Sequence, residues 1–221
     1  MISEDFVASV IEAYPKEFAL NNVAFDIGAH HGKFTEILSD KFDKVYAFEP
    51  FPENIKILKE KFANNPKVVI VEKAVHRKNS IERLYLNGED TQSSISKLYP
   101  QICAWNFRPQ NFIDVETITL DTFCEMEKID NLQFIKIDVE GAEQYVFDGA
   151  QKTLEKFNKS RGWIVLECHL MVDWDHINET LKKYDYKFID TNLYNVDFLE
   201  PCNHYLIHRS NYIFKSKIEV E

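Results

Sequence analysis

The sequence predicts an α/β fold with a mostly parallel sheet, and three observations lead to this class. From residue 22 onward, short apolar runs alternate with longer amphipathic runs, the pattern of strands joined by crossover helices. With 45% hydrophobic residues, the 221-residue chain can bury a large core. No Gly-, Ser- or Pro-rich stretch divides it, so residues 1–221 are predicted to form a single domain.

Each predicted element follows from its local pattern. Helices are predicted over residues 52–62, 141–157 and 174–184, because apolar side chains recur there at helical spacing and Pro52 stands near a helix start. Near the C-terminus, residues 186–190 and 204–214 are predicted to pair as an antiparallel hairpin at the sheet edge. Five apolar runs are predicted to be the remaining strands: Val23–Asp26, Lys44–Glu49, Lys67–Glu72, Gln133–Asp138 and Trp163–Cys168.

Two segments depart from this rhythm. Residues 1–20 contain one short amphipathic helix that ends before Pro15, so they are predicted to be an N-terminal helical extension. Residues 81–118 combine two strand-like runs with a polar loop and an aromatic stretch, and we expect an insertion over residues 87–115.

Composition and charge narrow the function classes. The formal net charge of -10 argues against a general affinity for nucleic acid, which requires clustered Lys and Arg. No apolar run approaches the roughly 18 residues of a transmembrane helix, and the acidic N-terminus lacks the pattern of a secretory signal. The four cysteines contain no CxxC pair, as expected for reduced thiols of a cytoplasmic protein. Whether the chain forms a homo-oligomer is left open.

The stretch "VAFDIGAHHGKF" (residues 23–34) predicts a cofactor-binding turn at the end of the first strand. Gly28 permits a tight turn close to a ligand, and Gly32 opens the next helix, whose free N–H groups favour an anion. Glu49 ends the second strand at close to the ~20-residue offset from Asp26 where an acid accepts hydrogen bonds from ribose hydroxyls. The two signals together predict an adenosine-containing cofactor, although His30 replaces the middle glycine of a G-x-G pattern.

The acid on the ribose does not distinguish NAD from S-adenosylmethionine. A carboxylate before the first glycine repels a pyrophosphate but suits an ammonium group, which the amino-acid end of S-adenosylmethionine supplies. An NAD-dependent oxidoreductase therefore stays the alternative enzyme, and a catalytically silent cofactor-binding module is the non-enzyme alternative.

A second motif makes a family resemblance specific. The run "LDTFCEMEKIDNLQFIKIDVEGAEQYVFDGAQKTLEKF" (residues 120–157) contains a K-x-D-x-E-G-x-E core preceded by an L-D run. Together with "FDIGAHHGKFT" and "YAFEPFPENIKIL", it resembles the FkbM family of S-adenosylmethionine-dependent methyltransferases over roughly residues 22–170. The core residues are Lys136, Asp138, Glu140, Gly141 and Glu143.

The resemblance implies a fold and an activity. The fold is a Rossmann-like, seven-stranded, mostly parallel sheet with an antiparallel C-terminal strand and helices on both faces. The activity is metal-independent O-methylation of a hydroxyl on a sugar, glycan, nucleotide-linked sugar or related natural product. Nucleic-acid methylation is disfavoured, because "DVEG" stands where amino-group methyltransferases carry N/D-P-P-Y/F.

Carried over by position, the resemblance also implies cofactor contacts. Around the adenosine it places Glu49 on the ribose, with Phe51, Asn54 and Ala74 beside the adenosine. Pro50 follows Glu49 and fixes the direction of its carboxylate. In the insertion, Ser93 and Ser94 are placed to reach the cofactor or the acceptor. At the methionine end it places Asp26, Gly28, Ala29, Gly32 and, near the sulfonium, Asp138. His30 occupies a position where the family commonly has Asn, so its contact stays open.

An alcohol acceptor needs a base, and we prefer His169, whose unperturbed pKa near 6.5 leaves it able to accept a proton. Asp138, Glu140 and Glu167 are its rivals, and Glu140 could instead complement a helix dipole. These carboxylates could also hold a hard cation, but the resemblance favours no metal. Tyr99, Trp105, Phe107 and Arg108 of the insertion offer aromatic faces and a guanidinium group that suit a sugar or a nucleotide-linked sugar as acceptor. Alternatively, they form an ordinary aromatic lid without a role in binding.

Overall fold

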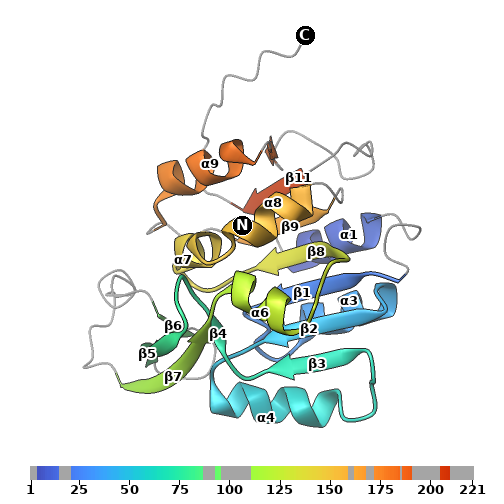
Figure 1. Cartoon of the computed structure of the whole chain (residues 1–221). Coiled ribbons are helices and arrows are strands. Elements are labelled where there is room, and N and C mark those ends of the chain that lie inside the picture. Colours follow the sequence, from blue (N-terminus) through green and yellow to red (C-terminus); the bar gives the residue numbers. More distant parts are fainter. Residues whose placement is uncertain are drawn as a thin grey trace.

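The computed structural model describes residues 4–14, 21–86, 93–95, 111–158, 162–167, 172–184, 186–190 and 205–209. Among the described residues, its main sheet has seven strands in the order β10-β11-β9-β8-β1-β2-β3, and all neighbouring strands pair in parallel (Figure 1). The strands are β1 (Val23–Ile27), β2 (Lys44–Phe48), β3 (Val68–Val71), β8 (Leu132–Ile137), β9 (Trp163–Glu167), β10 (Lys187–Asp190) and β11 (Tyr205–Arg209). The predicted α/β class with a parallel sheet is confirmed.

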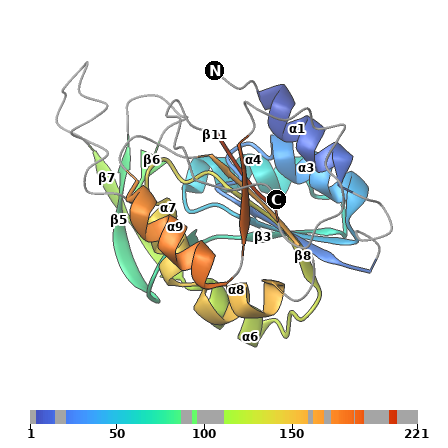
Figure 2. The same ribbon diagram turned by 90° about the horizontal axis from the view of Figure 1, so that it is seen from above.

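Helices cover both faces of this sheet (Figure 2). Alternation along the strands sends Ala24, Val45 and Phe134 to one face and Phe25, Tyr46 and Ile135 to the other. The first face carries α1 (Glu4–Ala13), α3 (Lys33–Lys41) and α4 (Pro52–Lys61). The second carries α6 (Leu120–Met126), α7 (Glu143–Asp148), α8 (Gln151–Asn158) and α9 (Trp174–Lys183). Each strand of the centre is therefore buried on both sides, as a parallel sheet requires.

The predicted antiparallel C-terminal strand is wrong. β11 pairs in parallel with both β10 and β9, and it lies between them rather than forming a hairpin with β10. Fourteen positions, 191–204, separate the two strands. A hairpin needs only two to five residues, whereas a parallel crossover needs about a dozen, so the length of this connection fits the parallel arrangement.

A second, smaller sheet lies beside the main one, with the strand order β4-β7-β5-β6 (Figure 1). It consists of β4 (Ala74–Val75), β5 (Ser80–Leu86), β6 (Ser93–Ser94) and β7 (Phe112–Ile118). Ala74, Leu84, Ile95 and Val115 form its buried side. Only residues 93–95 and 111–115 of the predicted insertion belong to the described part of the chain.

The N-terminal helix packs into the core. Val10, Ile11 and Tyr14 are buried against α3 and the main sheet. The ring of Tyr14 meets that of Trp163 edge to face, with centroids 5.1 Å apart. α1 therefore adds a layer to the domain and buries apolar surface that α3 and the sheet would otherwise expose.

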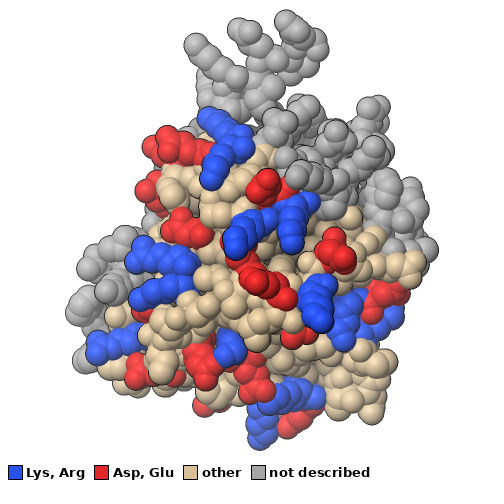
Figure 3. Space-filling view, in the orientation of Figure 1, with Lys and Arg blue, Asp and Glu red and all other residues tan. Residues whose placement is uncertain are grey.

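Charged side chains are mixed over the face drawn in Figure 3. Among the described residues of that face, Lys and Arg alternate with Asp and Glu, and neither sign gathers into one extended surface. Within the described residues, no helix has the length and apolar character needed to cross a membrane.

Candidate active site

The glycine turn after β1 brings three strand ends together. The N–H groups of Gly28 and Ala29 both donate to the carbonyl of Phe48 at 3.0 Å, and the N–H of Asp138 donates to the carbonyl of Ile27 at 3.0 Å. Gly28 has φ +81, and a Cβ there would lie 1.8 Å from the carbonyl oxygen of Asp138. Only glycine fits both the backbone conformation and this close approach.

Gly32 has a structural role at the start of α3. It is the N-cap residue with φ +74, and a Cβ would meet the ring of Phe62 at 2.6 Å and Leu58 at 2.7 Å. The glycine thus lets α3 begin directly against α4. It is not among the residues that line the site cavity described below.

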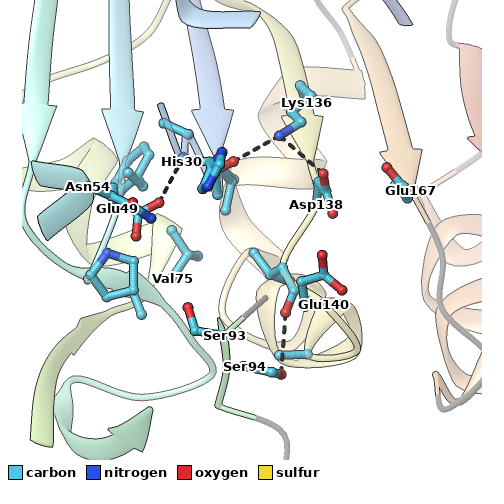
Figure 4. A pocket seen from close by; sticks show the side chains of 18 of the residues that line it. His30, Glu49, Asn54, Val75, Ser93, Ser94, Lys136, Asp138, Glu140 and Glu167 are labelled. Carbon is cyan, nitrogen blue, oxygen red and sulfur yellow. Dashed lines mark hydrogen bonds and ion pairs between the residues drawn. The ribbon is translucent and has the colours of Figure 1, made fainter. Parts of the chain in front are cut away.

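Glu49 is held at the end of β2 by backbone donors. The N–H of His30 donates to its Oε2 at 2.8 Å (Figure 4). The N–H of Phe51 donates to its Oε1 at 2.9 Å. The residue is only 4% exposed. Burial raises the pKa of Glu49, although these hydrogen bonds, Asn54 and the charge of Lys136 oppose the rise. A carboxylate has about four acceptor sites and these three donors leave one of them, so Glu49 can still accept a hydrogen bond from a ligand.

Asp26 occupies a different environment. It is fully buried, accepts a hydrogen bond from Thr35 Oγ1 at 2.6 Å and pairs with Lys136, whose Nζ lies 3.3 Å from its Oδ1. Lys136 also donates to the carbonyl of Gly28 at 2.9 Å and lies 3.7 Å from Asp138 Oδ2. Asp26 therefore supports the turn from behind and is not among the residues that line the cavity.

Three carboxylates lie at the ends of β8 and β9. Asp138 directly follows β8, Glu140 has φ +53 in the turn before α7, and Glu167 ends β9. One oxygen of Asp138, Oδ1, is buried and accepts no hydrogen bond within the described part of the chain. Figure 4 shows these acids on one side of the pocket and Glu49 with Asn54 on the other.

A cavity of about 350 Å³ joins these groups, within the size range of small-molecule sites. The second sheet closes one side with Leu84, Ser94 and Ile95, and Ser94 Oγ lies 3.5 Å from the carbonyl of Val139. Of the residues predicted from the sequence, these line the cavity: Gly28, Ala29, His30, Glu49, Pro50, Asn54, Ala74, Ser93, Ser94, Asp138, Glu140 and Glu167.

Other predicted residues lie elsewhere. Phe51 is not at the cavity surface; its ring packs against the second sheet, and its N–H fixes Glu49. His169, our preferred base, lies outside the described residues, as do Tyr99, Trp105, Phe107 and Arg108. Within the described residues, no group of three or more His, Cys, Asp or Glu side chains is arranged to hold a metal ion.

Several cavity residues were missed by sequence reasoning. Val7, Val75 and Ile95 lie outside the quoted motifs, and Lys33 and Phe34 end the glycine-turn motif without a predicted role. Lys136 could have been found, because a lysine inside the apolar run "LQFIKI" must be buried and must therefore meet a carboxylate.

The L-D run has a structural explanation. Asp121 accepts hydrogen bonds from the N–H of Lys152 at 3.0 Å and from the N–H and Oγ1 of Thr153 at 2.7 and 2.8 Å. Its carboxylate thus caps the first turn of α8 while Leu120 is buried in the core. This motif residue joins α6 to α8 and does not line the cavity.

A parallel α/β sheet with a glycine turn and strand-end acids defines a protein that binds a nucleoside-containing cofactor at the carboxyl edge. A family model described as the methyltransferase FkbM domain matches residues 26–188. The chain belongs to the FkbM methyltransferase family, so it is an S-adenosylmethionine-dependent methyltransferase.

Individual relatives are distant. The chain is 25% identical to the hexuronic acid methyltransferase AglP of Haloferax volcanii over 178 residues, which are 79% of this chain and 67% of the relative. Among solved structures, it resembles a precorrin-6y C5,15-methyltransferase from Geobacter metallireducens (TM-score 0.48, 14% identity, 85% of this chain and 73% of that one). It also resembles a precorrin 8W decarboxylase from Methanobacterium thermoautotrophicum (TM-score 0.47, 16% identity, 85% and 75%). Both structural likenesses are too weak to support an argument about function.

Proposed function

We propose that this methyltransferase methylates a hydroxyl oxygen of a sugar, such as a hexuronic acid, or of a related natural product. The observation that carries the proposal is the layout of the cavity: the fixed carboxylate of Glu49 faces it from one side and three strand-end carboxylates from the other. The first side suits the cofactor and the second suits an acceptor that must lose a proton. The hexuronic acid methyltransferase among the relatives points to the same acceptor class.

The residues present fit the cofactor. Glu49 would accept hydrogen bonds from the ribose hydroxyls, and the Gly28 turn, which tolerates no side chain, would lie against the methionine end with Ala29 and His30. When bound, S-adenosylmethionine supplies an electrophilic methyl group on a sulfonium. Pro50, Asn54, Ala74 and Ser94 would surround the adenosine. Asp26 would act on this turn through Lys136.

The role of the chain in the chemistry is to orient the acceptor and to remove its proton. As the acceptor oxygen attacks the methyl carbon, its O–H bond breaks and a base takes the proton. Asp138 is the described residue best suited to this, because its Oδ1 is buried beside the cavity without a hydrogen-bond partner in the described chain. Glu140, Glu167 and His169 are the competing candidates, and their variants are compared below.

The central experiment measures transfer of labelled methyl from S-adenosylmethionine to a panel of neutral sugars, hexuronic acids and nucleotide-linked sugars. For acceptors that carry no amino group or nucleobase, a labelled product that withstands mild alkali is an ether, which supports hydroxyl methylation. An alkali-labile product is an ester of the uronic carboxyl and would overturn it. Calorimetry with S-adenosylmethionine and NAD in parallel tests the alternatives: NAD binding alone would favour an oxidoreductase, and cofactor binding without any transfer a silent module.

Variants at the four candidate positions identify the base. We expect Asp138→Asn to lower turnover on the order of 10²-fold while the cofactor dissociation constant changes much less, the usual result of removing a general base. Glu140→Gln and Glu167→Gln are the matched carboxylate controls and should keep most of the activity. If His169→Ala shows the larger loss and Asp138→Asn does not, the base is His169.

Residues 1–221 are proposed to work as one cytoplasmic methyltransferase domain, with residues 87–115 binding the acceptor. The described strand β6, which belongs to this segment, supplies Ser93 and Ser94 to the cavity. Replacing Trp105 and Arg108 together by alanine should raise KM for the acceptor while leaving cofactor affinity unchanged. If the affinities for the acceptor and for the cofactor fell equally, the segment would instead be assigned to cofactor binding.

A further inference from the structure

Lys136 is a buried ammonium at the centre of the main sheet. It is 3% exposed, and lysine is almost never buried this far unless it is paired. Alternation along β8 places it on the same face as Phe134, whereas Ile135 and Ile137 face the opposite core. A charge in this position must be matched by acceptors from neighbouring elements.

Three oxygen atoms surround Lys136 Nζ. They are the carbonyl oxygen of Gly28 at 2.9 Å, Asp26 Oδ1 at 3.3 Å and Asp138 Oδ2 at 3.7 Å. An ammonium has three N–H donors, so its capacity matches this set. The first two oxygens belong to β1 and its turn, and the third follows β8. One side chain thus links the cofactor-binding turn to the proposed base.

The sheet register creates this arrangement and buries the ammonium. Asp26 lies directly opposite Lys136 in the β1–β8 pairing, with Ala47 and Val165 next in the same row. From α3, the ring of Phe34 covers the ammonium, with its centroid 5.2 Å from Nζ. Charges on buried groups such as Lys136 and Asp26 interact more strongly than charges at the surface.

The charge balance keeps this lysine protonated. Burial lowers the pKa of Lys136, but the carboxylates of Asp26 and Asp138 outweigh burial and leave the pKa above its ordinary value. Glu167 on β9 acts in the same direction, and Glu49 beyond β2 also interacts with the ammonium. The other charged or titratable groups at the cavity surface are His30, His31, Lys33 and Glu140.

We propose that Lys136 is a positioning residue that acts through Asp138: the ammonium, 3.7 Å from Oδ2, holds the carboxylate in place and leaves Oδ1 available to the acceptor hydroxyl. The proposal rests on the proposed hydroxyl methylation, in which Asp138 is the base. Without the ammonium, the carboxylates of Asp26 and Asp138 would be left as a like-charged pair in a buried site, which favours protonation of one of them.

The test compares Lys136→Met with Lys61→Met. Lys61 is a matched control, because its Nζ also donates to a turn carbonyl, that of Gly32 at 3.1 Å, and pairs with Glu36 at 2.8 Å, yet its side chain is 32% exposed. We expect Lys136→Met to lower kcat on the order of 10²-fold and to move the acidic limb of the pH–rate profile up by about one unit. Lys61→Met should change neither quantity. An unmoved acidic limb in Lys136→Met would overturn the proposal.

A measurement without turnover tests the same charge balance in the cofactor-free protein. Because lower pH neutralises the unpaired carboxylates, the Tm deficit of Lys136→Met should shrink between pH 8 and pH 5.5. The double variant Asp26→Asn/Lys136→Met removes one charge of each sign, so it should recover part of the lost Tm and the original acidic limb. If Lys136→Met does not fold, recovery of a folded double variant supports the proposal.

Two results contradict it: a Tm deficit that is independent of pH, and a double variant no more stable than the single one. Either would mean that the lysine only fills space. These outcomes are separate from the acceptor question, since failure of the unaltered protein to methylate any hydroxyl counts against the proposed function, whereas melting decides the role of Lys136.

Discussion

Asp26 and Glu49 are both acids near the ends of adjacent parallel strands, yet they have different environments. Glu49 follows the last residue of β2, and its carboxylate is fixed by two backbone N–H groups at the cavity surface. Asp26 is the penultimate residue of β1, and its carboxylate is buried between Thr35 and Lys136. The comparison teaches that a shift of two positions relative to the strand end separates an acid at the cavity surface from an internal one.

Gly28 lies in the turn between Asp26 and the cavity, and its carbonyl accepts from Lys136. Gly28→Ala should therefore have the largest effect on stability and on cofactor binding. The added Cβ would overlap the carbonyl of Asp138, and the positive φ would strain the backbone. We expect a loss of about 3 kcal/mol or more in the free energy of unfolding, together with loss of cofactor binding, measured by denaturant titration and calorimetry. Gly32→Ala is the control: its clash is with side chains that can move, so it should cost less. Equal losses would show that the close approach at Gly28 is unimportant.

Asp26→Asn should mainly reduce stability. It removes one partner of a buried ion pair and leaves Lys136 with less compensation, which typically costs about 3 kcal/mol. Denaturant unfolding measures this loss, and the cofactor dissociation constant of the folded fraction should change by less than about tenfold. A large loss of affinity with unchanged stability would instead assign Asp26 to direct cofactor contact, as the family resemblance implied.

Glu49→Gln should give the opposite result, with a loss of cofactor affinity of about tenfold or more. The amide would place an NH₂ group against one of the backbone N–H donors and remove the charge that favours ribose hydroxyls. Isothermal calorimetry with S-adenosylmethionine checks the affinity. If Asp26→Asn and Glu49→Gln both lowered mainly cofactor affinity, or both lowered mainly stability, the proposed difference between the two acids would be wrong.

A smaller, pH-dependent effect should follow from the raised pKa of Glu49. Hydroxyl donors favour the carboxylate, so cofactor affinity should weaken as pH falls from 7.5 to 5, beginning at a higher pH than for an exposed glutamate. The contribution of Glu49 to folding stability has the other sign: it is present below the unfolded pKa and is lost as pH rises through the folded pKa. Glu49→Gln should remove this component of the binding pH dependence, and an unchanged dependence would exclude Glu49 as its source.

Much of the fold could be predicted, because most strands of the main sheet correspond to short apolar runs in the sequence. Apolar runs of four to six residues between turn signals favour strands buried on both faces. The strands β1, β2, β3, β8 and β9 coincide with the five predicted runs to within one or two residues. The direction of the C-terminal strands could not be predicted, because a strand pattern is the same in both directions. Only the partners chosen in three dimensions decide it.

Prediction of the site was limited for a similar reason: the sequence does not show which residues of neighbouring strands lie opposite one another. The glycine turn and Glu49 have local signatures, so their place at the cavity could be predicted. Asp26 has the same residue type as a ligand-binding acid, and only its pairing opposite Lys136 shows that it faces inward. Lys136 itself was part of the quoted motif without a role, because its role depends on contacts with residues more than 100 positions earlier in the chain.

The N-terminal helix has a consequence for engineering this enzyme. α1 precedes the region matched by the family model, yet Val7 forms part of the cavity wall and Lys41 of α3 donates to the carbonyl of Ile11 at 2.6 Å. A segment that bears none of the recognised motifs therefore helps to shape the binding chamber. Exchanging this helix between homologues would therefore change the shape of the cavity without touching any of the recognised motifs.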